Sequence, residues 1–348
     1  MSAESVGRPW RVSDPVAVQD AWVGIWQRAI LNRESILNHD LSFWSQPETQ
    51  TALEEWIDSA LGEDSAESDL TAPVLLESAA DSGRDSLSAK GVITAKANGV
   101  ICGLEAVRVT LEKLDSGIRV IEALDDGCAV SAGEEVFVAT GSATALLAGE
   151  RTALNICSHL SGIATATARL VEAAGEVKIF DTRKTLPGLR RFQKYAVTVG
   201  GGCNHRHDLA DFPMFKENHR AILQKSQPQL SGNPLEEVRW IKSALSRNGF
   251  SGPISIEVED EASLRACLKE GIEVILVDNI PPATLTEWIE RALQDQIPVE
   301  ASHLEASGGI DGETLRAHAS SGVGRISVGA ITHSSRVLDL SMSVELVS

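Results

Sequence analysis

Basic side chains gather in one stretch of a chain that is otherwise strongly acidic. The 348 residues carry a formal net charge of −18. Residues 178–220 nevertheless hold nine Lys or Arg against four acids. Three of these cations, Arg183, Lys184 and Lys216, directly follow apolar runs typical of strands, which argues against an ordinary solvated basic face. Cations in a pocket need anions to offset their desolvation. The pattern therefore predicts a carboxylate or phosphate ligand, held by Arg forks.

Carboxylates follow two other strand-like runs. Glu257 and Glu259 end one run and Asp278 ends the next. Mg²⁺ is typically bound by one or two carboxylates together with substrate phosphate oxygens, so these residues predict a magnesium site. The alternative is that they pair with the Lys and Arg residues, and the two arrangements are compatible.

Small residues follow the last two strand-like runs, as Ser307-Gly308-Gly309 and Gly329-Ala330. Glycines let backbone N–H groups approach a phosphate. A lone Ser-Gly-Gly is ordinarily a turn, but the loops after the final strands of an α/β barrel commonly form a phosphate site. We therefore expect phosphate binding here.

A zinc site is the alternative use of Cys203, His205, His207 and Asp208. These donors crowd into one segment, and no second cluster completes a tetrahedral set by its spacing. His205 beside Arg206 fits anion binding better.

Six short apolar runs, each ending in polar residues, must position these side chains. They are 177–180, 213–215, 254–256, 274–277, 303–304 and 325–328, with helical patterns between them at 234–247, 261–269 and 283–293. Such alternation predicts a parallel sheet with crossover helices. Polar residues at the carboxyl end of all six runs favour a barrel over an open sheet, which binds mainly at one switch point. Six strands make an incomplete α/β barrel.

The part of the chain before residue 177 has a different pattern of apolar and polar residues. Strand-like runs at 74–77, 90–97 and 118–123 predict a small α+β domain. Residues 144–173 predict one or two helices, with Gly149 and Gly162 as candidate breaks. Apolar residues at helical spacing in 15–31 predict a helix packed on the main body. We expect an N-terminal helical extension (1–45), a sandwich domain (46–160 with about 331–348) and a barrel domain (161–330).

Composition narrows the classes of partner. The negative charge disfavours nucleic acid and anionic membrane. No apolar run approaches a membrane span, and no secretory signal is evident. Five cysteines without a C-x-x-C spacing indicate a reducing compartment. We expect a cytoplasmic protein.

Ordered motifs over roughly residues 50–345 strongly resemble the quinolinate phosphoribosyltransferase family. They are 150–155 (ERTALN), 160–164 (LSGIA), 181–188 (DTRKTLPG), 194–197 (KYAV), 200–206 (GGGCNHR), 216–219 (KENH), 257–259 (EVE), 277–279 (VDN), 305–309 (EASGG), 327–330 (SVGA) and 332–334 (THS). The resemblance implies a sandwich domain followed by a six-stranded α/β barrel. It also implies a homodimer, or a higher oligomer, in which Arg151 reaches the partner's site in trans.

The resemblance also implies roles for individual residues. Quinolinate would be bound by Arg151, Thr182, Arg183, Lys184, His205, Arg206 and Lys216. Phosphoribosyl pyrophosphate would be bound by Glu257, Asp278, Ser307, Gly308, Gly309, Val328, Gly329, Ala330 and His333. Glu257 and Asp278 would serve Mg²⁺, and with Lys184 they would form the catalytic set.

The implied activity joins quinolinate to a phosphoribosyl group and releases CO₂, a step in NAD biosynthesis. Residues 207–215 (HDLADFPMF) depart from the family's usual run and lie beside the cations. Two alternatives remain: a related phosphoribosyltransferase of the molybdenum-locus type, acting on another acceptor, and a non-catalytic metabolite-binding paralogue. The full set of cations argues against the first, and the presence of Glu257 and Asp278 argues against the second.

Overall fold

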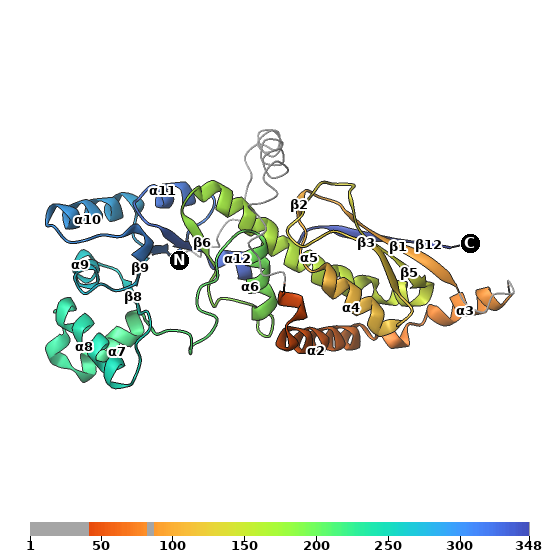
Figure 1. Cartoon of the computed structure of the whole chain (residues 1–348), viewed down its shortest axis with the longest axis horizontal. Coiled ribbons are helices and arrows are strands. Elements are labelled where there is room, and N and C mark those ends of the chain that lie inside the picture. The colour runs from red at the N-terminus through yellow and green to blue at the C-terminus, as the bar shows by residue number, and fades with distance from the viewer. Residues whose placement is uncertain (1–41, 82–86, 348) are drawn as a thin grey trace, which may run out of the picture.

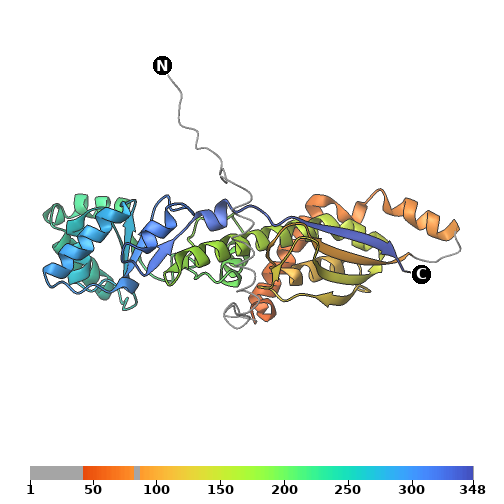
Figure 2. The same cartoon turned by 90° about the horizontal axis from the view of Figure 1, so that it is seen from above.

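The structure is a computed structural model that describes residues 42–81 and 87–347. The helix expected at 15–31, and nearly all of the expected extension, lie outside the described residues. Figures 1 and 2 show an elongated molecule with an antiparallel sheet toward one end and an α/β barrel toward the other. The long helix α5 (Ala143–Ala174) runs between these two parts (Figure 1).

The antiparallel sheet has the strand order β12-β1-β5-β3. Its strands are β1 (Ser88–Ala95), β3 (Arg119–Ala123), β5 (Glu135–Ser142) and β12 (Leu340–Leu346). Alternate residues of β1 are buried, as expected of a sheet with one face on a core. The short strands β2 (Gly99–Val100) and β4 (Ala129–Val130) pair separately. Helix α4 (Leu104–Leu114) and α5 share the core beneath the sheet, which contains Ile93, Leu111, Phe137 and Leu146.

Two helices precede this sheet. Helix α2 (Pro47–Asp64) follows a short 3₁₀ turn at Phe43–Ser45 and buries Leu53 and Ile57. Helix α3 (Ala72–Asp81) contains residues 74–77, so the expected strand there is wrong. A run of four residues is too short to show a period, whereas its Leu and Glu residues and the surrounding Ala residues favour a helix.

Helix α5 is uninterrupted over 32 residues, so neither glycine breaks it. Each glycine instead permits close packing. A Cβ on Gly162 would lie 2.2 Å from the Arg336 carbonyl oxygen, and one on Gly149 would lie 2.9 Å from Leu111. The helix therefore stays continuous from the antiparallel sheet to the barrel.

Six parallel strands form the barrel in the order β6-β11-β10-β9-β8-β7. They are β6 (Lys178–Phe180), β7 (Met214–Phe215), β8 (Ser255–Val258), β9 (Val274–Asp278), β10 (Leu304–Ser307) and β11 (Arg325–Ser327). The first strand pairs with the last, which confirms the barrel prediction. Beyond β6, Cys203 adds a single bridge to Phe180. Within the described ranges no ladder joins Cys203 to β7, so the barrel has one seam there.

Helices cover the outside of the barrel. They are α6 (Arg190–Val199), α7 (Glu217–Ser226), α8 (Pro234–Arg247), α9 (Glu261–Lys269), α10 (Pro282–Gln294), α11 (Leu315–Ala319) and α12 (Ala330–His333). Short 3₁₀ turns at Ala66–Ser68, Pro228–Leu230 and Ala301–His303 complete the elements. The barrel core includes Ile179, Ile256, Val277 and Ile326. In the described part of the chain, no helix has both the length and the apolarity needed to cross a membrane.

Candidate active site

The carboxyl ends of the barrel strands bring most of the predicted residues to one rim. Thr182, Arg183 and Lys184 follow β6, and Lys216 follows β7. Glu257 lies within β8, whereas Asp278 ends β9. The predicted phosphate-binding residues, 307–309 and 328–330, end or follow β10 and β11. Parallel strands place all their carboxyl ends at the same edge, so the fold collects these residues from distant parts of the chain.

Two guanidinium groups lie close together at this rim. Arg206 is 8% exposed, and its NH1 donates to the Phe212 carbonyl at 3.2 Å. Burial and the repulsion of nearby Arg183 lower the pKa of Arg206. The Nε of Arg183 is buried without a hydrogen-bond partner in the described chain. A buried, unpaired donor beside a second cation is costly unless an anion binds there.

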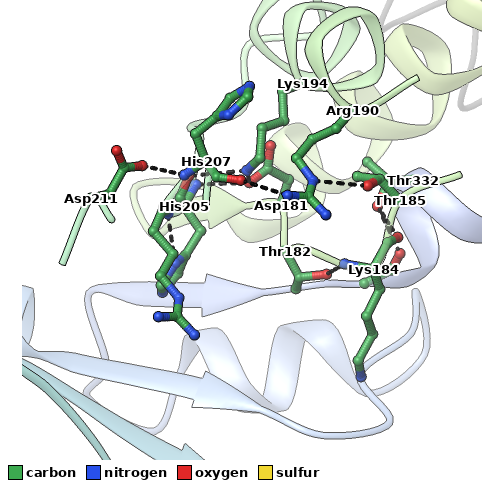
Figure 3. A network of polar contacts seen from close by, with 12 residues as sticks. Asp181, Thr182, Lys184, Thr185, Arg190, Lys194, His205, His207, Asp211 and Thr332 are labelled. Carbon is green, nitrogen blue, oxygen red and sulfur yellow. Dashed lines mark hydrogen bonds and ion pairs between the residues drawn. The ribbon is translucent and has the colours of Figure 1, made fainter. Parts of the chain in front are cut away.

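A buried ion pair holds the segment that carries Arg206 (Figure 3). Lys194 Nζ, from α6, lies 2.5 Å from Asp181 Oδ1 and donates to the His205 carbonyl at 3.0 Å. The His205 N–H donates to the same Asp181 oxygen at 2.7 Å. Burial raises the pKa of Asp181 to about 6, despite the attraction of Lys194, so Asp181 is ionised at neutral pH. The pair therefore fixes both backbone groups of His205.

The His205 imidazole faces a second buried carboxylate. Its Nδ1 accepts from the Arg206 N–H at 2.7 Å, which leaves the proton for Nε2. Nε2 lies 3.4 Å from Glu305 Oε1. Arg325 binds the other Glu305 oxygen at 2.9 Å and packs over the Phe180 ring. Burial alone would raise the pKa of Glu305, but His205 and Arg325 outweigh it and hold that pKa below its usual value.

The predicted metal carboxylates are partly engaged. Glu257 binds Lys216 Nζ at 2.7 Å and accepts from the Glu217 N–H, at the start of α7, at 3.1 Å. The alternative of pairing with Lys is thus realised for Glu257. Asp278 Oδ2 accepts from the Asn279 amide at 2.7 Å. Burial raises the pKa of Glu259, and repulsion from Glu217, Glu257 and Asp278 raises it further.

Two glycines bring the other end of the rim together. A Cβ on Gly308, at φ +96°, would lie 2.2 Å from Asn279 Oδ1, so only glycine fits there. A Cβ on Gly329 would lie 2.9 Å from the Lys184 side chain and 3.4 Å from both His333 Nε2 and Thr182 Oγ1. The loops after β6 and β11 therefore converge at Gly329.

Arg151 lies apart from this rim. It is on α5, its side chain is 63% exposed, and its described ionic partner is Glu150 at 3.9 Å. It lines a groove of about 340 Å³ with residues of α2 and α5 and with Leu186 and Leu189. Apart from Arg151 itself, no predicted site residue lines this groove.

The residues that hold the site in place were not predicted from the sequence. Asp181 and Lys194 were noted only as charges and within family motifs, and Glu305 and Asn279 only within motifs. Asp181, Asn279 and Glu305 lie in or directly after strands, a signal that could have identified them. Lys194 lies on a helix and carries no such local signal.

The fold and this rim define an α/β-barrel enzyme that binds organic anions and phosphate groups. Family models of the quinolinate phosphoribosyl transferase N-terminal and C-terminal domains match residues 69–161 and 163–343. The chain belongs to the quinolinate phosphoribosyltransferase family.

Named relatives and a solved structure agree with this assignment. A probable nicotinate-nucleotide pyrophosphorylase [carboxylating] of Bacillus subtilis is 39% identical, over 74% of this chain and 84% of the relative. The nicotinate-nucleotide pyrophosphorylase [carboxylating] of Mycobacterium leprae is 37% identical, over 73% of this chain and 86% of the relative. The structure of NadC from Streptococcus pyogenes has a TM-score of 0.71 at 32% identity, covering 85% of this chain and 97% of that chain.

Proposed function

We propose that the chain is a decarboxylating phosphoribosyltransferase of NAD biosynthesis. It converts quinolinate and phosphoribosyl pyrophosphate into nicotinate mononucleotide, pyrophosphate and CO₂. The observation that carries this proposal is the buried Arg183 Nε, which lacks a partner in the described chain, beside the buried guanidinium of Arg206. The names of the relatives support the same reaction.

Quinolinate carries two adjacent carboxylates, and the rim offers a matching set of donors. Arg183 and Arg206 each present a planar fork suited to a carboxylate. His205 lies beside Arg206, with its Nε2 held toward Glu305. Lys184 follows β6 and Lys216 follows β7. The Thr182 hydroxyl accepts from the Lys184 N–H at 3.0 Å. A bound dianion would neutralise the buried cations, which are poorly solvated by water.

The chemistry needs no nucleophilic side chain. The pyridine nitrogen forms a bond to the anomeric carbon as the bond to pyrophosphate breaks, and the pyrophosphate carries away the electron pair. The ring nitrogen is then positively charged. The bond to the neighbouring carboxylate breaks to release CO₂, its electron pair stays on the ring carbon beside that nitrogen, and this carbon takes up a proton. The rim cations contribute positioning and charge stabilisation.

Phosphoribosyl pyrophosphate fits the opposite part of the rim. We expect Glu257 and Asp278 to bind the ribose hydroxyls. The 307–309 and 328–330 loops, with His333, are suited to the phosphate end.

The same carboxylates fit Mg²⁺. The described residues contain no group of three or more His, Cys, Asp or Glu arranged to hold a metal, so an ion would depend on substrate phosphate oxygens. Burial raises the pKa of Glu259, and repulsion from Glu217, Glu257 and Asp278 adds to it, so a cation bound here would relieve that repulsion. Glu257 and Asp278 would hold it, with Glu257 shared with Lys216. When bound, the ion would neutralise charge on the leaving pyrophosphate.

Arg151 completes the proposed quinolinate site from a partner subunit. It lies on α5, apart from the rim of its own barrel, and its exposed side chain can reach a neighbouring molecule. A two-fold dimer would give two equivalent shared sites.

Three linked assays test the function. Purified protein with quinolinate, phosphoribosyl pyrophosphate and Mg²⁺ should form nicotinate mononucleotide. EDTA should abolish turnover, and Mg²⁺ or Mn²⁺ should restore it. Nicotinate, which lacks one carboxylate, should be a far poorer acceptor because it leaves buried cations unpaired. Equal catalytic efficiency on the two acids would refute a site built for a dianion.

A further inference from the structure

Three consecutive residues of α6 are buried and make polar contacts in three directions. Gln193, Lys194 and Tyr195 are 0%, 2% and 5% exposed. Gln193 donates to the Thr332 carbonyl at 3.0 Å and accepts from the Leu186 N–H at 2.9 Å. Tyr195 donates to Asp126 at 2.8 Å, on the side of the antiparallel sheet. Helix α6 therefore contacts several regions around the rim at once.

Lys194 forms an ion pair with Asp181 in which both side chains are buried. Removing an ammonium and a carboxylate from water costs several kcal/mol per ion, and well-packed apolar residues are often as stable. The Lys194–Asp181 pair is therefore weak evidence for a stabilising role. A role in fixing one particular conformation accounts better for this pair of buried charges.

The conformation that the pair fixes is that of residues 204–206. Lys194 Nζ binds the His205 carbonyl, and Asp181 Oδ1 binds the His205 N–H. The Asn204 amide nitrogen, in the orientation that its neighbours require, donates to Asp181 Oδ2 at 2.7 Å and to the Lys194 carbonyl at 3.0 Å. The peptide groups on both sides of His205 are thus tied to one buried ion pair.

Figure 3 shows how the network around Lys194 lies relative to the rim. Lys194 runs from α6 toward Asp181 and the backbone of His205, whereas the Lys184 side chain points away from this network. The carbonyl that Lys194 holds belongs to the peptide between His205 and Arg206, two residues of the proposed quinolinate subsite. Its orientation sets the direction from which both side chains leave the backbone.

We propose that Lys194, acting through Asp181 and Asn204, is a positioning residue that holds His205 against Glu305 and thereby aims Arg206 at the carboxylates of the acceptor. This inference rests on the proposed function, because it assigns the network to the acceptor half of that site. The neighbouring Gln193 donates to the Thr332 carbonyl, and the Thr332 hydroxyl donates to the Lys184 carbonyl at 2.8 Å. Helix α6 therefore also contacts the segment that carries Lys184.

The test uses a variant that removes both buried charges. In Lys194→Met/Asp181→Asn no uncompensated ion remains, so folding should survive and can be checked by thermal unfolding. The matched control is Lys242→Met, which also removes a lysine bonded to a backbone carbonyl, that of Glu270, on the outside of the barrel. KM for each substrate, and quinolinate binding by calorimetry, are measured for all three proteins.

We expect the double variant to raise the quinolinate KM and Kd at least about tenfold, since misplacement by about 1 Å can cost about a hundredfold. The KM for phosphoribosyl pyrophosphate should stay within about twofold, and the control should match the wild type. Equal effects on both substrates, or no effect in a folded variant, would overturn the proposal.

A second variant covers the case in which the double variant does not fold. Asn204 is exposed, so Asn204→Asp should be tolerated while its carboxylate repels Asp181. It should raise the quinolinate KM selectively, and an unchanged quinolinate KM would count against the proposal. Quinolinate binding and turnover by the wild type show whether the proposed function or the positioning role of Lys194 has failed. If the wild type binds quinolinate without turnover, only the proposed function fails. If the wild type does not bind quinolinate, both fail.

Discussion

At the scale of single residues, Asn279 shows how this chain keeps a carboxylate in place. It adopts a left-handed conformation, at φ 55°, that side chains other than Gly and Asn rarely accept. Its amide donates to Asp278 Oδ2, and its N–H donates to the Ser307 carbonyl at 2.9 Å. Uncommon backbone conformations cluster at functional sites, where surrounding contacts hold them.

Two substitutions separate the roles of Asn279. Asn279→Ala loses the amide and strains the backbone, whereas Asn279→Gly loses only the amide. We expect both to lower kcat/KM for phosphoribosyl pyrophosphate about tenfold, because each frees Asp278, and the alanine variant should also be less stable by about 1 kcal/mol. Steady-state kinetics with urea unfolding decides the point. Wild-type kinetics in the glycine variant would show that the amide does not orient Asp278.

Some site residues could be predicted from their type and position in the sequence, and others could not. Arg183, Glu257 and Asp278 were predicted because a charge at a strand end has few structural uses, whereas Arg206 was predicted from its place beside His205 and from the family resemblance. Lys194 was not predicted as a site residue because a lysine on an amphipathic helix has no sequence signal that sets it apart from other lysines. Its burial depends on a partner 13 positions away in the sequence, Asp181, and no local pattern encodes that distance.

At the scale of elements, α5 depends on Gly162. A Cβ there would lie 2.2 Å from the Arg336 carbonyl oxygen and 2.8 Å from Val337 Cα, both backbone atoms that move with difficulty. Gly162→Ala should therefore lower the free energy of unfolding by about 1–3 kcal/mol or more. Gly62→Ala on α2 is the control, because nothing lies within 4 Å of its Cβ. It should stabilise by about 0.5–1 kcal/mol, following helix propensity. Urea unfolding measures both, and equal effects would contradict this packing.

Helix α11 contributes a titratable element to the barrel. His318 is buried, its Nδ1 has no hydrogen-bond partner in the described chain, and burial lowers its pKa. In the unfolded chain His318 has an ordinary pKa, about 6.5, whereas in the folded protein its pKa is lower. Below about pH 6.5 the unfolded state holds more protons, so this residue's contribution to stability is lost as the pH falls.

His318→Leu should remove that loss. Between pH 7 and pH 5, the free energy of unfolding should fall less in the variant than in the wild type, by up to about 1.4 kcal/mol per pH unit. Urea unfolding at the two pH values gives the comparison. Parallel losses in the two proteins would show that His318 does not contribute.

Elements differ in how well the sequence predicted them. Helices α8 and α9 match their predicted bounds because an apolar period, a capping residue and a C-terminal cation agree. Residues 74–77 were misassigned because a four-residue run has no period. The pairing of β12 with β1 joins residues about 250 positions apart, which no local pattern specifies.

At the scale of the whole molecule, the elongated shape raises the question of how Arg151 serves a site (Figure 1). We predict that two inactive variants complement each other. An Arg151→Ala subunit keeps an intact barrel, and a Lys184→Ala subunit keeps a usable Arg151. Mixing them under subunit exchange should restore roughly a quarter of wild-type activity, since about half of the dimers are mixed and each has one intact site.

Mass spectrometry provides the control for this mixing experiment by showing that exchange has occurred. Recovery near a quarter indicates that Arg151 acts across the interface. Confirmed exchange without any recovery would mean that Arg151 acts within its own chain or has no role in the site.

The most direct test of the central claim follows one carboxylate through the reaction. Quinolinate labelled with ¹³C in the carboxylate beside the ring nitrogen is incubated with phosphoribosyl pyrophosphate and Mg²⁺. If the chain is a decarboxylating phosphoribosyltransferase, all of the label should leave as CO₂, in equal amounts with pyrophosphate and nicotinate mononucleotide. Label retained in the nucleotide, or pyrophosphate released without CO₂, would contradict the account.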